Sequence, residues 1–423
     1  MGVGIQAHEP KHQGQEEREA AEGDGADTAA LAALYLYGDV LESVVDRVPA
    51  ADLAATAGVS REWLRAVRSA LRRRPRRLPW LVVHLHGRRR RTTAAYDPHS
   101  GAWLTVQAPR HATPSHVRLV RGARGDRVCA LSLSGLDVAG DPLGTSACVA
   151  MKAPSVWRVD PVFAAVGDRV VALGGACQLA LAEGEDAAAV EVHESGSWIA
   201  CDPMPAALRE SAAATWLSVA ATDQRVYLAD RATGWASWFD PSKRRWGPTR
   251  RLAPDASVST WGVAPGRAGA GAERLVLFGA KRQGEGPASR VVIQTWEVDG
   301  DGLDLSPGVV HDAMPREMSE RLFPRDEDEE DDEEMSPSIG VRGSATGGYV
   351  YNAAELANGA VLYELREGKD GSAVERWEWV PCAPAVRAEP LGRAILACSP
   401  VGLDELSRGL PPLSSRRAYT DAS

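Results

Sequence analysis

Residues 96–103 read YDPHSGAW and residues 239–246 read FDPSKRRW, and an Ala-Pro pair follows each stretch, at residues 108–109 and 253–254. A looser copy places Val192-His193 before Trp198 and then Met204-Pro205. We expect the aromatic-Asp-Pro turn to end one strand, and the next strand to carry a tryptophan that packs between neighbouring sheets. The recurrence predicts several copies of one β unit rather than a single unrepeated sheet.

Two further features recur along this β-rich region. Glycine pairs occur at Gly174-Gly175 and Gly347-Gly348, with a degraded copy at Gly279-Ala280. Glycine suits a strand end where another backbone crosses closely. Four tryptophans stand 95, 48 and 50 residues apart, so a repeat of about fifty residues fits, with one weakly marked copy in the first gap. We assign the repeated residues to the core of the units: Trp103, Gly174, Gly175, Trp198, Trp246, Trp296, Gly347 and Gly348.

A repeat of this length resembles kelch, in which each copy forms one four-stranded blade of a β-propeller. The resemblance implies a mainly β fold with about six blades, near residues 78–110, 116–152, 155–206, 214–254, 260–312 and 338–384. The first unit has room for only about three strands. We therefore predict that a strand at residues 392–399 completes it, so that chain from both ends closes the ring and leaves no open sheet edge.

Residues 36–71 have a helical pattern instead. Asp39 and Glu42 have the spacing of a capping box, Pro49 ends the first helix, and Ser60 begins a third after a turn-rich second segment. The apolar positions of the first helix fall on one wide stripe: Val40, Leu41, Val44, Val45 and Val48. Three helices in about forty residues bury too little apolar surface to be stable alone. The stripe therefore needs cover, either from the chain's own β domain or from another protein.

The composition is that of a soluble globular protein of 423 residues, with 44% hydrophobic residues and a formal net charge of −9. An acidic balance argues against general nucleic-acid binding, which depends on Lys and Arg that neutralise phosphates. The six cysteines include no pair two residues apart, which disfavours zinc fingers and thioredoxin-like motifs. We find no apolar signal segment and no membrane-length apolar run, and expect an intracellular protein, cytoplasmic or nuclear or both, without membrane association.

The sequence divides into four parts. We expect residues 1–28 to be a disordered leader and residues 405–423 a disordered tail, because both are polar. Residues 29–74 form the helical module and residues 78–404 the β region, with an arginine-dense junction between them. Residues 314–337 are predicted to be an inserted loop, because nine acidic residues in a row, 326–334, repel one another and stay solvated. Whether the arginine clusters act as a nuclear signal stays open.

No catalytic motif occurs in the sequence. It contains no Gly-x-x-x-x-Gly-Lys-Ser/Thr phosphate loop, no Gly-x-Ser-x-Gly elbow and no His-Glu-x-x-His zinc helix. His84 and His86 fall on one face of a predicted strand, but a pair without a third ligand favours an ordinary structural role over metal binding. We predict no catalytic residue, no metal site and no cofactor.

The helical segment resembles an F-box, the module that docks on a Skp1-type adaptor in cullin-RING ubiquitin ligases. The matching residues are Leu36, Asp39, Leu41, Val44, Val45, Arg47, Val48, Pro49, Asp52, Leu53, Val59 and Trp63. Two positions depart from the pattern: Tyr37 stands where proline is usual, and Ser60-Arg61-Glu62 where Cys-Lys-Arg is usual. An F-box-like module followed by kelch-like repeats resembles the plant F-box/kelch-repeat family over roughly residues 34–400.

This resemblance implies a non-catalytic substrate receptor of an SCF-type E3 ubiquitin ligase. The helical module would bind a Skp1-like adaptor, and through it a cullin, while the loop face of the propeller would bind a target protein. Some relatives control enzymes of phenylpropanoid and flavonoid metabolism, which suggests that class of target. The implied adaptor-docking residues are Leu36, Leu41, Val44, Val45, Val48, Pro49, Leu53, Val59 and Trp63.

Two other functions are compatible with the sequence. The first is a kelch scaffold that binds a partner without any ligase, favoured if the departures at Tyr37 and residues 60–62 disable docking. The second is a propeller oxidase acting on sugars or small alcohols, which would need a metal or a convergent polar cluster at the ring axis. A Skp1 and cullin pull-down separates the first from the ligase receptor, and a metal assay tests the second.

Overall fold

The computed structural model divides the chain into two compact units. The smaller unit consists of Met1–Val48 and Ala55–Pro75, and the larger of Pro49–Ala54 and Arg76–Ser423. The structure describes residues 38–73, 78–87, 91–107, 118–175, 186, 188–209, 216–267, 272–284, 289–311, 313–324, 336–365 and 374–410. The predicted leader and the acidic run lie outside these ranges.

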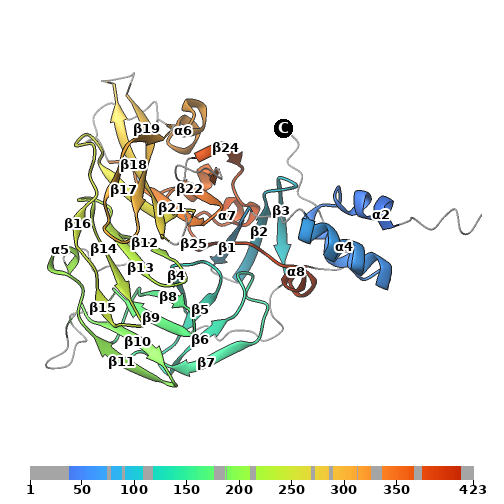
Figure 1. The fold of residues 1–423 in the computed structure, drawn as a ribbon, viewed down its shortest axis with the longest axis horizontal. Helices are drawn as coiled ribbons and strands as arrows, with labels where there is room; N and C mark the ends of the chain where they lie inside the picture. Colours follow the sequence, from blue (N-terminus) through green and yellow to red (C-terminus); the bar gives the residue numbers. More distant parts are fainter. Residues whose placement is uncertain are drawn as a thin grey trace, which may run out of the picture. The chain divides into compact units, whose positions relative to one another are not determined.

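The larger unit is a six-bladed β-propeller, in which each blade contains four antiparallel strands and the innermost strands surround the ring axis (Figure 1). A short parallel pairing of the innermost strands joins blades 2 and 3 into one sheet. From the axis outward, blade 1 contains β25 (Arg393–Ser399), β1 (Trp80–His86), β2 (Arg91–Asp97) and β3 (Ala102–Val106). In the same order, blade 2 contains β4 (Arg118–Gly122), β5 (Val128–Leu131), β6 (Gly135–Ala139) and β7 (Cys148–Lys152). Blade 3 contains β8 (Val162–Val166), β9 (Arg169–Leu173), β10 (Val190–Glu194) and β11 (Ser197–Cys201). Blade 4 contains β12 (Leu217–Ala221), β13 (Val226–Asp230), β14 (Trp235–Asp240) and β15 (Arg245–Trp246), and the short strand β16 (Arg250–Arg251) also pairs with β14. Blade 5 contains β17 (Thr260–Pro265), β18 (Arg274–Gln283), β19 (Arg290–Asp299) and β20 (Leu305–His311). Blade 6 contains β21 (Ile339–Ser344), β22 (Gly347–Asn352), β23 (Ala360–Leu365) and β24 (Val374–Val380). The prediction of a mainly β propeller with about six blades is confirmed.

The ring is closed by chain from both ends of the domain. β25, from the C-terminal part, pairs antiparallel with β1 along its whole length, from Trp80 opposite Ser399 to His86 opposite Arg393 (Figure 1). Blade 1 therefore has three strands from the start of the domain and one from its end. The prediction that residues 392–399 complete the first blade is confirmed.

Tryptophans on the outer strands of blades 1, 3 and 4 join each of these blades to the one before it. The indole N–H of Trp103 donates to the Pro381 carbonyl oxygen at 2.8 Å, that of Trp198 to Lys152 at 2.7 Å, and that of Trp246 to Asp202 at 3.0 Å. Each acceptor lies on or just after the outer strand of the preceding blade. Because Pro381 follows blade 6, the Trp103 bond is a second closure of the ring.

Trp296 is buried, but it does not occupy the predicted repeat position. It lies on β19, the third strand of blade 5, and packs at 5.6 Å from the ring of Trp261. The outer-strand position of blade 6 is held by Trp377, opposite Tyr363, as Trp103 lies opposite Tyr96. Trp246 and Trp296, which are 50 residues apart, thus occupy positions that are not equivalent. A tryptophan in the sequence does not show by itself whether it lies on the third or the fourth strand of a blade.

The two glycine pairs are also not equivalent. Gly174-Gly175 follows the second strand of blade 3, whereas Gly347-Gly348 begins the second strand of blade 6. Both pairs still need hydrogen at Cα: a Cβ on Gly175 would lie 2.4 Å from the Asp160 backbone, and one on Gly347 would lie 2.4 Å from the Tyr363 carbonyl oxygen. Close backbone approach therefore requires glycine at two different places in a blade. The two glycine pairs are thus not the copies of one repeated feature that the sequence pattern predicts.

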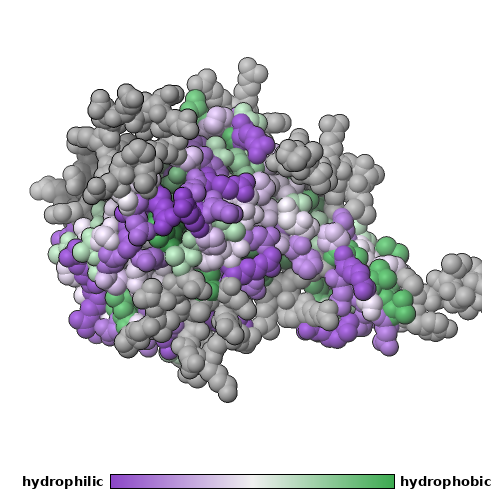
Figure 2. Space-filling view, turned by 90° about the horizontal axis from the view of Figure 1, so that it is seen from above, coloured by the Kyte–Doolittle hydropathy of each residue, from purple (hydrophilic) through white to green (hydrophobic). Residues whose placement is uncertain are grey.

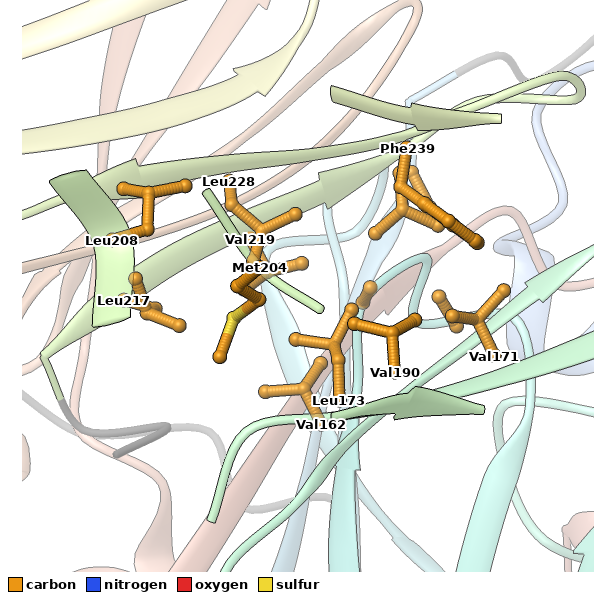
Figure 3. Close-up of a cluster of buried hydrophobic side chains, with 14 of the residues drawn as sticks. Val162, Val171, Leu173, Val190, Met204, Leu208, Leu217, Val219, Leu228 and Phe239 are labelled. Carbon is orange, nitrogen blue, oxygen red and sulfur yellow. The ribbon is translucent and has the colours of Figure 1, made fainter. Parts of the chain in front are cut away.

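Apolar side chains pack between the blades. Figure 3 shows the cluster between blades 3 and 4, where valines and leucines from β8, β9 and β10 meet those of β12 and β13 and the ring of Phe239. Met204 and Leu208, from the connection that contains α5 (Ala206–Arg209), fill the space between the two sheets. The alternation of side chains along each strand thus supplies one apolar face to each neighbouring blade.

Two predicted irregular segments contain ordered helices. α6 (Arg316–Leu322) occupies the start of the predicted insertion, and its Ser319 and Leu322 are buried. α8 (Leu403–Gly409) occupies the start of the predicted tail, and Leu406 and Leu410 join the core of blade 1. The predicted bounds of 314 and 405 are wrong, because a few well-placed apolar residues suffice to anchor a short helix on a blade. The larger unit also contains η3 (Leu356–Asn358) and α7 (Pro384–Ala388).

The N-terminal helices are α2 (Gly38–Val45), α3 (Ala50–Ala57) and α4 (Arg61–Arg73). In the smaller unit α2 contacts α4, and an ion pair joins Glu42 to Arg73. Glu42 is thus engaged with α4, whereas the predicted capping box had it turned back towards the helix start. The Ser60 hydroxyl accepts a hydrogen bond from the Trp63 N–H at 3.3 Å, which caps α4.

The start of α3 belongs to the larger unit. Ala50 and Ala51 pack with Trp80 and Val82 of blade 1 and with Leu406 of α8. The prediction had placed all of residues 29–74 in one helical module. Through this packing, Pro49–Ala54 belongs with the larger unit and not with the rest of that module.

The seam between β25 and blade 2 supplies a stability test. Gly125 has φ +75°, and a Cβ there would lie 2.6 Å from the backbone nitrogen of Cys398, whereas Gly167 has φ +61° and open space around it. Gly125→Ala should lower the midpoint of thermal unfolding well beyond Gly167→Ala, because both incur the left-handed backbone cost of about 1–2 kcal/mol but only the former pushes the ring apart. Circular dichroism melts measure the difference, and equal midpoints would contradict a tight seam.

Candidate functional site

The structure separates the predicted adaptor-docking residues into groups. Leu36 lies outside the described residues. Leu41, Val45 and Leu53 are buried, and Val48 and Trp63 are half-buried. Val44, Pro49 and Val59 are exposed, with 37% of Val44 and 65% of Val59 open to solvent. The three buried residues are not available to another protein unless the helices unfold.

α2 is apolar on two faces. Leu41 and Val45, four residues apart, form one buried stripe, and Val40 and Val44 form a second, exposed stripe beside it. Figure 2 shows hydrophobic surface on the smaller unit, where these helices lie. Val40 was left out of the predicted docking set, although its spacing of four from Val44 already indicated a shared face. Two exposed valines in a helix of eight residues are an unusual use of apolar side chains unless something covers them.

The ring has a cavity of about 500 Å³ at one end of its axis. The loops that join the first to the second strand of blades 2, 4, 5 and 6 line it, together with the end of β25. Arg124 forms ion pairs here with Asp223 at 2.7 Å and with Asp126 at 3.4 Å. Burial raises the pKa of the Asp126 carboxyl in spite of this arginine. The described lining therefore carries an ion-paired group of three charged side chains.

One of the two histidines of β1, His84, is held within the sheet by hydrogen bonds at both ring nitrogens. His84 is buried, with Nε2 at 3.0 Å from the Pro142 carbonyl oxygen and Nδ1 at 3.1 Å from the Thr93 hydroxyl. Because a carbonyl only accepts, Nε2 must carry the proton and donate it, which leaves Nδ1 to accept from Thr93. Burial lowers the pKa of His84 to about 4. Both ring nitrogens are engaged, so His84 is a structural residue.

Within the described part of the chain, no group of three or more His, Cys, Asp or Glu side chains is placed to hold a metal ion. None of the described helices has the length and apolar content needed to cross a bilayer.

The closed ring and the helical unit define a β-propeller protein with an N-terminal helical module. No protein-family model matches the sequence. The F-box/kelch-repeat protein At1g23390 of Arabidopsis thaliana is 31% identical over 384 residues, which cover 87% of this chain and 91% of that protein. The chain belongs to the F-box/kelch-repeat family of plants.

Solved structures that match this chain do so with low TM-scores and share little sequence with it. Hsv2 of Kluyveromyces lactis matches with a TM-score of 0.34 and 10% identity, over 69% of this chain and 83% of that one. A protein of unknown function from Bacteroides caccae matches with a TM-score of 0.36 and 9% identity, over 71% of this chain and 94% of that one. The assignment of the fold rests on the strand pairing within this chain itself.

The pKa of His84 predicts a pH dependence of stability. The folded state keeps His84 neutral down to about pH 4, while the unfolded state binds a proton near pH 6.5, so the free energy of unfolding should fall as the pH is lowered between these values. The expected loss for this residue is roughly 3 kcal/mol over that whole interval and about 2 kcal/mol between pH 7.0 and pH 5.0. His84→Gln should flatten the dependence, measured by urea unfolding at pH 7.0 and 5.0.

The exposed His99 supplies the matched control, since His99→Gln keeps the buried ring. This variant should retain the wild-type dependence on pH. An unchanged slope in His84→Gln would show that the buried imidazole is not the group that titrates.

Proposed function

We propose that this protein is the substrate receptor of an SCF-type ubiquitin ligase. The helical unit would dock on a Skp1-like adaptor, which binds a cullin, and the propeller would hold the protein to be ubiquitylated. The observation that carries the proposal is that Val40, Val44 and Val59 each expose apolar surface in a member of the F-box/kelch-repeat family. Such a surface is stabilised when a partner covers it.

The contribution of the chain in this proposal is proximity. Binding a target and an adaptor at the same time raises the effective concentration of target lysines near the conjugating enzyme. The chain itself would make and break no covalent bond. We place it in the cytoplasm, the nucleus or both, and we propose enzymes of phenylpropanoid or flavonoid metabolism as the class of target on the strength of the family resemblance.

A kelch scaffold without ligase function is the second candidate. One observation favours it: Pro49–Ala54, which includes two of the predicted docking residues, belongs to the larger unit, and Ala50 and Ala51 pack on blade 1. Part of the F-box-like segment is thus already engaged within the chain. Val40 and Val44 of α2 and Val59, which lies just before α4, stay exposed. The ligase receptor is therefore the better supported function.

The docking test uses the exposed valines. Val45→Asp, which the sequence alone would suggest, is unsuitable, because Val45 is only 1% exposed and a buried carboxylate would unfold the helix. Val44→Asp combined with Val59→Asp should reduce co-purification of a plant Skp1-type adaptor at least tenfold, since two carboxylates would enter an apolar interface. Pull-down from purified components, followed by titration, measures the loss.

Val149→Asp is the matched control, because Val149 on β7 is 64% exposed and lies in the propeller. This variant should bind the adaptor as well as the wild type. Equal binding by the double variant would contradict docking through these valines. Failure of the wild-type chain to bind any adaptor would favour the scaffold.

A further inference from the structure

Three tryptophans are exposed on blades 3 and 4 in spite of their large apolar area. Trp157 lies in the connection before β8, Trp216 directly before β12 and Trp235 at the start of β14. They are 39%, 61% and 36% exposed, and Val159 beside Trp157 is also exposed. Large aromatic side chains at a surface are typical of the residues that dominate binding energy in protein interfaces.

Strand register places all of these residues at one end of the ring. Leu217, next to Trp216, pairs with Asp230, and Ala236, next to Trp235, pairs with Ala229, so both tryptophans lie where β13 ends. Val162 pairs with Leu173 in the same way in blade 3. The first strands of blades 3 and 4 contact each other. The exposed tryptophans therefore lie at the same end of the ring, the end opposite the 500 Å³ cavity.

A buried ion pair fixes Trp157 and Val159. Arg158, between them, is fully buried and donates to Glu191 at 3.1 Å and to the carbonyl oxygens of Gly174 and Ala189, each at 2.8 Å. The Val159 N–H donates to the Gly175 carbonyl oxygen at 2.7 Å. With Arg158 turned inward, the side chains on either side of it are turned outward. This backbone is held in place before any partner binds, which lowers the entropy cost of binding.

A tight turn fixes Trp216 and Trp235. The Asp230 carboxylate accepts from the Ala232 N–H at 3.0 Å and from the Thr233 hydroxyl at 2.7 Å, and the Arg231 N–H donates to the Trp216 carbonyl oxygen at 3.0 Å. β12 and β14 are two strand spacings apart in the sheet, so the backbones that carry Trp216 and Trp235 are about 10 Å apart. That distance suits a single extended segment lying across both of them.

Two arginines give this surface its charge. Arg250 and Arg251 are exposed and pair in register with Ala236 and Trp235. The Arg251 Nε donates to the Thr233 carbonyl oxygen at 3.2 Å, which anchors the side chain beside Trp235. Within the described part of the chain, no carboxylate forms an ion pair with either arginine, although the whole protein is acidic. A guanidinium held in this way can bind a carboxylate with two hydrogen bonds.

We propose that Trp157, Trp216, Trp235, Arg250 and Arg251 form the surface that recognises the target, and that the target segment carries an apolar side chain next to Asp or Glu. The tryptophans cover the apolar group and the arginines bind the carboxylates. Nucleic acid fits less well, because it needs a longer run of unpaired basic residues and the chain carries a net charge of −9. This proposal names the target site of the ligase receptor and rests on that function for its biological role.

The test uses a random 12-residue peptide library displayed on phage, selected against the purified full-length chain. The enriched peptides should place Leu, Ile or an aromatic residue next to Asp or Glu. Trp216→Ala and Arg251→Glu should each weaken a synthetic enriched peptide at least tenfold in fluorescence anisotropy. A peptide whose acidic residue is replaced by Lys should regain binding to Arg251→Glu, which general loss of structure cannot produce.

Arg245→Glu is the matched control, because Arg245 is exposed and pairs with Asp240 at the other end of the same blade. This variant should leave peptide binding unchanged. Selection of no peptide, selection of basic peptides, or competition by a single-stranded oligonucleotide would overturn the proposal. All of these variants should bind the Skp1-type adaptor like the wild type. Failure of the wild-type chain to bind the adaptor would count against the ligase proposal alone.

Discussion

The pairing of β25 with β1 is the constraint on which the rest of the larger unit depends. A ring of sheets has no free edge only if its first and last strands meet, and here seven residue pairs join segments more than three hundred positions apart in the chain. On either side of this blade, the Trp103 indole joins it to blade 6 and the tight approach of Gly125 to Cys398 joins it to blade 2. Because this closure needs both ends of the domain, the blades can be correctly placed only after nearly the whole chain is present.

Closure also gives the ring two chemically different ends. At one end, the loops after the first strands carry an ion-paired cavity around Arg124. At the other end, a buried arginine and an Asp-capped turn hold apolar side chains in solvent. Rigid blades make this possible, since the backbone that presents an exposed tryptophan is fixed by bonds to strands on either side of it. Such a scaffold can present binding residues on loops without losing the fold.

The helical unit differs from the propeller in how it uses apolar side chains, because it buries some of them and leaves others exposed on the same helix. α2 is too short to support two apolar faces by itself, yet Leu41 and Val45 are buried while Val40 and Val44 remain exposed. The start of α3 is committed to blade 1 by alanines, which are small enough for close packing. A chain that holds one helix on its ring and leaves valines of another uncovered is suited to link the ring to a second protein.

Local pattern determined much of this protein. The recurring aromatic-Asp-Pro turn and tryptophan predicted the blades, and the missing strand of the first unit predicted closure by residues 392–399, because both depend on period and strand count. Tertiary structure decided which of two adjacent valines is buried, which strand carries Trp296, and why Gly347 must be glycine. Those outcomes depend on neighbours supplied by distant segments. The outward direction of Trp157 likewise follows from Arg158 reaching Glu191 across the blade, a contact between residues 33 positions apart that no local pattern encodes.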